Sequence, residues 1–161
     1  MLDDYFFVQL GRGNKVVLPL NSVKEVISLS YNEVCPIPGV TPALLGVVNQ
    51  RGKLLWVLDL GNLLNLPASI ENIRLQANLT LLVLNDRHNE RQVGCVVSAL
   101  KGIVTLESTE FQTLDKQSST ALTSFFLAIA LIAQETVAAL DINAILNHIQ
   151  TESFNNLGQN V

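Results

Sequence analysis

The chain has 161 residues, of which 48% are hydrophobic and only 15% charged, and its formal net charge is −4. This length suits one domain with a substantial core, so we predict a single domain over residues 1–161. The acidic balance and the absence of a Lys/Arg cluster argue against nucleic acid and against anionic lipid as partners. We therefore expect no nucleic-acid partner and no direct membrane insertion.

Three further features indicate the compartment. The start of the chain, Met1 to Asp4, is acidic where a secretory signal peptide would be basic. The longest uncharged apolar run, Phe125 to Ala133, is much shorter than a membrane-spanning helix requires. Cys35 and Cys95 lie in apolar stretches without a pairing pattern, so we expect both to be buried free thiols. Together these features predict a soluble cytoplasmic protein.

Short apolar segments separated by turn signals recur along the chain and predict an all-β fold. The turn signals include Gly11 to Asn14 and Asn85 to Glu90. A spacing of about 8–12 residues per strand is typical of barrels or of a sandwich. In chain order, the predicted strands are Tyr5–Leu10, Val16–Leu20, Val23–Ser28, Val47–Gln50, Lys53–Leu58, Leu79–Leu84, Gln92–Ser98, Leu100–Leu106, Phe125–Ile132 and Thr136–Leu140.

Helix is predicted mainly near the C-terminus, and loops elsewhere. Segments 67–78 and 107–124 are predicted to be loops because they combine proline or hydroxyl-rich composition with no clear periodicity. Residues 155–161, rich in Asn, Gln and Gly, are expected to form a flexible tail. One face of a helix is indicated by the spacing of Ile142, Ile145, Leu146 and Ile149.

Residues 37–60 contain two apolar runs around the polar tip Asn49-Gln50-Arg51-Gly52. This pattern predicts a β-hairpin whose turn faces water. Gly52 supplies the positive φ that the turn needs, and Arg51 projects from a rigid base. A guanidinium in that position is either a recognition element or a solvated turn residue, and the hairpin alone does not decide between them.

An internal repeat becomes visible when Asp59 is aligned with Asp141, 82 residues later. In each copy an apolar strand ends at the aspartate, and apolar residues follow at helical spacing. We therefore predict that Asp59 and Asp141 are N-caps of short helices, accepting backbone N–H groups that have no partner in the helix. The alternative, a catalytic pair of carboxylates, is disfavoured because the two residues occupy repeat-related positions.

A second alignment supports the first. Residues 16–27 align with residues 93–104 at an offset of 77, so that Val23 falls on Leu100. A length difference in one intervening loop accounts for the two offsets. The domain is therefore predicted to contain two copies of one small β-barrel, the alternative being chance similarity among apolar strands.

No catalytic motif is present. His88 and His148 have no Cys, Asp or Glu at metal-ligand spacing, and the glycine-rich and nucleophile motifs of common enzymes are absent. Lys24 and Glu25 are interpreted as the solvent face of an early strand. We accordingly predict a protein that is not an enzyme and that has no metal or other cofactor.

Several segments together resemble CheW-like adaptor domains. They comprise Val17 to Val26, the Ile-Pro, Gly-Val-Val-Asn and Arg-Gly elements within residues 37–52, and Trp56 to Leu60. The second half adds Val93 to Val97, Leu100, Ile103-Val104 and the C-terminal strand, aspartate and helix. This resemblance spans about residues 5–150. It implies two SH3-like five-stranded β-barrels around a shared core, as two lobes formed roughly by the first and second halves of one CheW-like domain.

The resemblance also implies a function. Such domains are non-catalytic scaffolds that couple chemoreceptors to a CheA-type histidine kinase, a two-component system, in chemotaxis, phototaxis or type IV pilus motility. By motif position, the residues that contact the receptor's cytoplasmic tip would be Arg51, Val23, Leu100 and Thr80. Differences from the family pattern at Gln50, Ser98 and the Ala-rich segment leave the receptor and motility output open. The alternative function is a regulatory β-domain that binds a small ligand outside a receptor array.

Overall fold

The computed structural model describes residues 1–66, 78–86, 91–114 and 124–158, with side chains described up to residue 150. Within these ranges the chain is mostly β-strand, as predicted. The strands are β1 (Leu2–Leu10), β2 (Asn14–Pro19), β3 (Val23–Ser30), β4 (Leu44–Gln50), β5 (Lys53–Asp59), β6 (Asn78–Asn85), β7 (Gln92–Val97), β8 (Ala99–Glu107), β9 (Phe111–Thr113), β10 (Phe126–Ile132) and β11 (Glu135–Leu140). The helices are α1 (Leu60–Leu63) and α3 (Ile142–Gly158), with 3₁₀ turns η1 (Leu20–Ser22), η2 (Tyr31–Glu33) and η3 (Ser108–Glu110).

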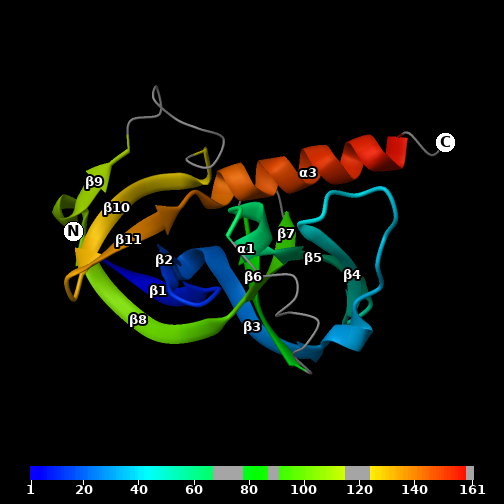
Figure 1. Cartoon of the computed structure of the whole chain (residues 1–161), viewed down its shortest axis with the longest axis horizontal. Helices are drawn as coiled ribbons and strands as arrows, with labels where there is room; N and C mark the ends of the chain where they lie inside the picture. The colour runs from blue at the N-terminus through cyan, green and yellow to red at the C-terminus, as the bar shows by residue number, and fades with distance from the viewer. Residues whose placement is uncertain (67–77, 87–90, 115–123, 159–161) are drawn as a thin grey trace.

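The strands form two curved sheets, each of SH3-like barrel form. Sheet A has the order β8-β1-β2-β11-β10-β9, and sheet B has the order β3-β6-β7-β5-β4. Figure 1 shows sheet A on the left, sheet B on the right, and helix α3 running across the top from the end of β11. None of the helices in the described part of the chain combines the length and hydropathy needed to cross a bilayer.

Among the described residues, three apolar clusters hold the two sheets together and fill them. The largest lies between the sheets, and the face of α3 predicted from sequence packs into it through Ile145, Leu146 and Ile149. A second cluster fills sheet B, and a smaller third fills sheet A. Strand β6 contributes to two clusters, with Leu81 facing the interior of sheet B and Leu82 facing the core between the sheets. Burial on both faces explains why residues 81–84 of this strand are all apolar.

The internal repeat is confirmed by the irregularities of strand pairing. The register of β4 against β5 shifts between Leu44 and Gly46, and that of β10 against β11 shifts between Phe126 and Ala128, which lie 82 residues later. The offset of 77 recurs in the same way, because an extra residue stands at Lys24 in the pairing of β3 with β6 and at Lys101 in that of β8 with β1. Chance similarity of apolar strands does not reproduce such bulges.

The two sheets do not follow the two halves of the chain. Sheet A joins β1 and β2 from the start of the chain to β8 through β11 from its end, whereas sheet B contains β3 through β7. Two parallel pairings join strands of different repeats, namely β2 to β11 at Val17–Ala139 and β7 to β5 at Gly94–Val57. The repeats therefore exchange strands, and each barrel takes strands from both copies.

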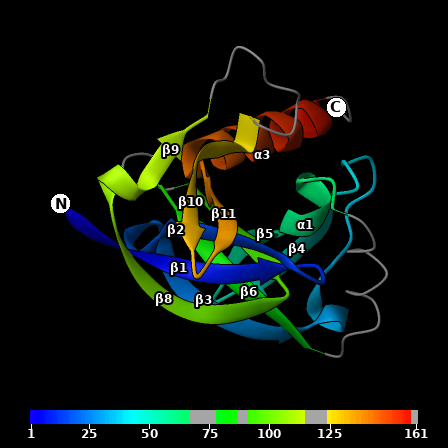
Figure 2. The same ribbon diagram turned by 60° about the vertical axis from the view of Figure 1, so that its left-hand side comes forward.

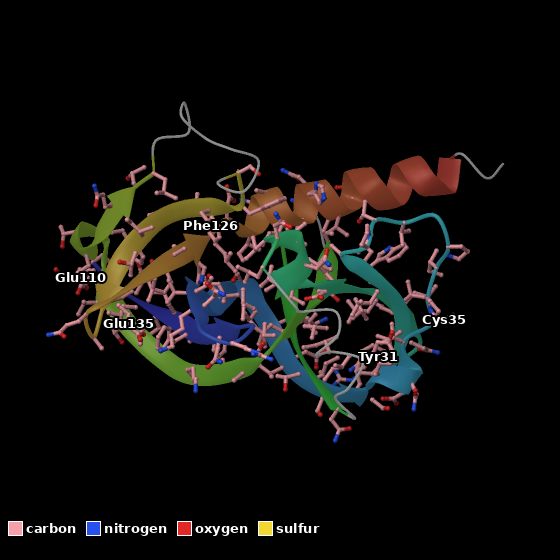
Figure 3. The ribbon with its side chains drawn as sticks, in the orientation of Figure 1. Tyr31, Cys35, Glu110, Phe126 and Glu135 are labelled. Carbon is pink, nitrogen blue, oxygen red and sulfur yellow. The ribbon has the colours of Figure 1, made fainter. Side chains whose placement is uncertain are left out.

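Two local expectations need correction. Segment 107–124 is not a loop throughout, because β8 runs to Glu107 and is followed by η3 and β9 before residue 114. Cys35 is exposed rather than buried, at the outer edge of sheet B (Figure 3). It lies there because its backbone pairs with Val47 on the edge strand β4.

Some expectations concern residues outside the described ranges. Residues 67–77 of the first predicted loop are among these, and Asn78 already begins β6. His88 also lies outside the described residues. Helix α3 extends to Gly158, and the expected flexible tail over residues 155–161 stays a prediction.

Candidate protein-interaction site

The turn between β4 and β5 fixes the backbone from which Arg51 projects. Gln50 pairs with Lys53, so Arg51 and Gly52 alone form a two-residue turn. Their φ angles of 53° and 84° are those of a type I′ turn, whose twist matches that of the flanking strands. The Asn49 Oδ1 atom accepts a hydrogen bond of 2.9 Å from the backbone N–H of Gly52 and so ties the turn to β4.

Glu25 of β3 orients the Arg51 side chain. The Nη2 atom of Arg51 lies 3.2 Å from Oε2 of Glu25, and the two side chains are 76% and 23% exposed, respectively. This single contact leaves most of the guanidinium facing solvent. Arg51 is therefore held in direction without being covered, which suits a group that binds a partner.

Sequence reasoning missed the role of Glu25, which it assigned to a solvent face. The carboxylate shares the inner face of sheet B with Ile27 and Leu29, both of which pack in that sheet's interior cluster. The alternation of these three residues was the available signal. An acidic residue in register with two core positions points toward the barrel and can reach across its open end.

Val23 and Leu100, predicted as repeat mates, occupy equivalent positions in the two sheets. Val23 begins β3 and pairs with Leu84, and Leu100 in β8 pairs with Val8. Both partners are fully buried in the core between the sheets. Val23 packs partly against that core, and Leu100 is 37% exposed. The two side chains therefore lie at the rim of the apolar core rather than inside it.

Three residues further along, Val26 and Ile103 extend this rim. They are also 77 residues apart, and both are large exposed apolar side chains. Val26 pairs with Leu82, and Ile103 pairs with Phe6, so each continues the face that Val23 or Leu100 begins. The repeat offset was the signal that would have found them. Figures 1 and 2 place their strands, β3 and β8, next to each other along the lower side of the molecule.

Thr80 and Arg51 lie at the margins of this apolar rim. Thr80 is half-buried on β6 opposite Ser28, on the sheet face that also carries Leu82. It is four residues from the partner of Val23, which corresponds to roughly 13 Å along a strand. Arg51 contacts β3 through Glu25, whose side chain lies on the face of that strand opposite to Val26. The four predicted residues thus border one region without forming a compact cluster.

A family model described as the CheW-like domain matches residues 4–150. The chain belongs to the CheW-like domain family. This confirms the resemblance inferred from the sequence, and the match covers both sheets and the first half of α3.

Two similar proteins support the assignment. The chemotaxis protein CheW of Bacillus subtilis is 26% identical over 105 residues, which are 65% of this chain and 62% of that protein. The chain thus matches less than two thirds of its curated relative. The crystal structure of the scaffolding protein TtCheW from Thermoanaerobacter tengcongensis has a TM-score of 0.73 at 17% identity, covering 88% of this chain and 90% of that one. At this identity the likeness shows the fold.

In this CheW-like domain the two repeat-related aspartates cap helices. The Oδ1 atom of Asp59 accepts the N–H of Asn62 at 3.3 Å, and that of Asp141 accepts the N–H of Ala144 at 3.1 Å. Asp59 is only 2% exposed. Each carboxylate thus satisfies a backbone donor in the first turn of its helix, at the positive end of the helix dipole.

The titratable side chains that the structure describes form no group of three or more suited to a metal ion. Burial raises the pKa of the Cys95 thiol, which keeps it protonated and unreactive. The ring of His148 packs edge-on against Phe125, with 5.4 Å between centroids. The described site offers contact surface: an apolar rim beside an oriented guanidinium.

Proposed function

We propose that this CheW-like domain is a non-catalytic cytoplasmic adaptor that couples chemoreceptors to a CheA-type histidine kinase. The observation that carries the proposal is the repeat-related apolar rim formed by Val23, Val26, Leu100 and Ile103, with Arg51 oriented nearby. Large exposed apolar side chains in equivalent positions on two adjacent edge strands favour a partner that spans both sheets.

The receptor contact follows from the chemistry of this rim. An amphipathic helical tip would lay its apolar face against Leu100 and Val23 and bring a carboxylate to Arg51. An apolar centre with a charged margin is the usual organisation of a protein interface. Thr80, at the far margin of the rim, would contribute a polar contact.

An adaptor also needs a second surface, and we assign the kinase contact to β10. Leu131 is 66% exposed on this strand, and Leu127 is also a large exposed apolar residue. The strand carries no charge, so little desolvation cost opposes burial of its outer face. This assignment gives the Ala-rich segment over residues 125–133 a role in partner binding.

The alternative function, binding of a small ligand, can be judged from the lining of a groove beside Arg51. Small-molecule sites are usually lined mainly by apolar side chains. This groove is lined mostly by charged and amide side chains, including Lys24, Lys53 and Asp86. The lining favours a polar segment of a protein over a small apolar ligand, and so favours the adaptor.

Capture experiments with the purified chain test the adaptor proposal. The baits are the receptor cytoplasmic fragment and the CheA-type kinase from the same organism, offered separately. We expect Leu100→Asp to lose the receptor and keep the kinase, and Leu131→Asp to lose the kinase and keep the receptor. Both variants replace an exposed leucine by aspartate, so each is the control for a general effect of the substitution in the other. Capture of neither bait by the folded wild-type chain would contradict the proposal.

A further inference from the structure

A groove of about 720 Å³ opens at the end of sheet B, beside the β4–β5 turn. Its floor includes Leu55 and Val83, which belong to the interior cluster of that sheet. The groove is therefore the open mouth of the barrel and not part of the apolar rim between the sheets. The other residues that line this groove are Lys24, Glu25, Gln50, Arg51, Lys53, Leu54, Asn85, Asp86 and Gln92.

The mouth carries three cations, Lys24, Arg51 and Lys53, against two carboxylates, Glu25 and Asp86. Of its two carboxylates, Glu25 is bound to Arg51, and Asp86 is bound at 2.6 Å to Arg91, just outside the groove. Lys24 and Lys53 form no ion pair with any residue that the structure describes. An acidic chain with only ten Lys and Arg residues thus gathers cations around one opening. Such a concentration attracts anionic groups.

The other barrel provides an internal comparison, because the same framework lacks two of these three cations there. The repeat mates of Arg51 and Lys53 are Ala133 and Glu135. The Ala133-Gln134 turn has positive φ at both residues, so the turn forms without arginine or glycine. Glu135 is bound at 2.7 Å by Lys15, whose Nζ also lies 5.8 Å from the centroid of Phe7. The fold therefore does not require the cationic mouth of sheet B.

We propose that the mouth of sheet B binds an acidic peptide segment of a protein partner. One carboxylate binds the exposed N–H groups of Arg51, which Glu25 already orients, and others lie near Lys24 and Lys53. The side-chain amides of Gln50 and Asn85 face the peptide backbone, and Leu55 takes an apolar side chain. The apolar floor favours a peptide, which can supply an apolar side chain, over a nucleic acid or an anionic membrane. The proposal shares Arg51 with the proposed receptor contact, but its test uses the isolated chain and needs neither receptor nor kinase.

Fluorescence polarisation with fluorescein-labelled hexaglutamate tests the proposal, with labelled hexaglutamine as the uncharged control. The variants are Lys24→Glu and Lys53→Glu, and the matched control is Lys101→Glu. Lys101 is the repeat mate of Lys24 and occupies the same bulge in sheet A, so its reversal changes the net charge equally. Circular dichroism confirms that each variant is folded.

We expect hexaglutamate to bind, hexaglutamine not to bind, and high salt to abolish binding because exposed charges are screened. Lys24→Glu and Lys53→Glu should each weaken hexaglutamate binding about tenfold, a change equivalent to about 1.4 kcal/mol. Lys101→Glu should change it less than twofold. Equal weakening by Lys101→Glu, no binding of hexaglutamate, or equally tight binding of a labelled oligothymidylate of the same charge would overturn the proposal. None of these outcomes depends on the receptor or the kinase.

Discussion

Arg51 and Glu25 join the β4–β5 turn to strand β3 through one ion pair of 3.2 Å. Arginine is an unusual residue for a backbone φ of 53°, because a type I′ turn favours Asn or Gly at that position. The chain thus places a long cation where turn stability alone would select another residue. Because turn stability does not account for an arginine at this position, its presence supports a role for Arg51 in partner binding.

Replacement of Arg51 by Asn separates the two roles. The lost ion pair is exposed and is worth about 0.2–1 kcal/mol, and Asn relieves the strain of the left-handed backbone. We therefore expect urea denaturation to show an unfolding free energy within about 0.5 kcal/mol of wild type, while capture of the receptor fragment is lost. A loss of stability above about 1.5 kcal/mol, beyond the range of exposed pairs, would show that Arg51 is mainly structural.

The caps predict a matched pair of stability losses. Asp59→Ala and Asp141→Ala should each lower the unfolding free energy by about 1 kcal/mol, because each removes a hydrogen-bond acceptor for a first-turn N–H group. Asp59→Asn keeps an acceptor and should restore most of the loss. Thermal or urea unfolding measures all three. Unchanged stability in Asp59→Ala together with loss of receptor capture would contradict the capping role.

Two glycines with similar φ angles differ in whether a Cβ would clash with a neighbouring residue. Gly46 has φ of 146°, and a Cβ there would lie 2.1 Å from the carbonyl oxygen of Cys35. Gly102 has a similar φ of 142°, but a Cβ there would meet nothing within 4 Å. Gly46→Ala should therefore be severely destabilising, by more than about 3 kcal/mol, and Gly102→Ala clearly less so. Similar losses in the two variants, measured by urea unfolding, would mean that backbone strain dominates at both.

The two cysteines should differ in reactivity. Cys35 is exposed, whereas Cys95 is fully buried and burial raises the pKa of its thiol. A disulfide reagent such as Ellman's reagent should therefore titrate one thiol in the native protein and both in guanidinium. The Cys35→Ser variant should show no fast-reacting thiol. Rapid reaction of two thiols under native conditions would contradict the packing around Cys95.

Most of the strand pattern could be predicted, because alternation and turn residues are local signals. All ten predicted strands are present, and the alignment of the two repeats matches Lys24 with Lys101, the two positions at which bulges occur. The missed strand β9 is only three residues long and too short for periodicity to show. The repeat contained the information nonetheless, because Gln112 pairs with Ile129 just as Cys35 pairs with Val47 in the other copy.

What escaped prediction depends on contacts between distant parts of the chain. The exchange of β1 and β2 into the sheet of the second repeat is invisible in any single strand, since it is set by the parallel pairings of β2 with β11 and of β7 with β5. The ion pair of Arg51 with Glu25 joins residues 26 positions apart. The sequence shows that the two residues carry opposite charges, but only the folded structure brings them together.

The most direct test of the adaptor proposal measures kinase activity in a reconstituted mixture of receptor fragment, CheA-type kinase and this chain. We predict that the chain increases receptor-dependent autophosphorylation of the kinase, and that Leu100→Asp and Leu131→Asp each abolish the increase. Each variant would lose one of the two contacts that coupling requires. An autophosphorylation rate unchanged by the folded wild-type chain, at concentrations that saturate both partners, would contradict the proposed function.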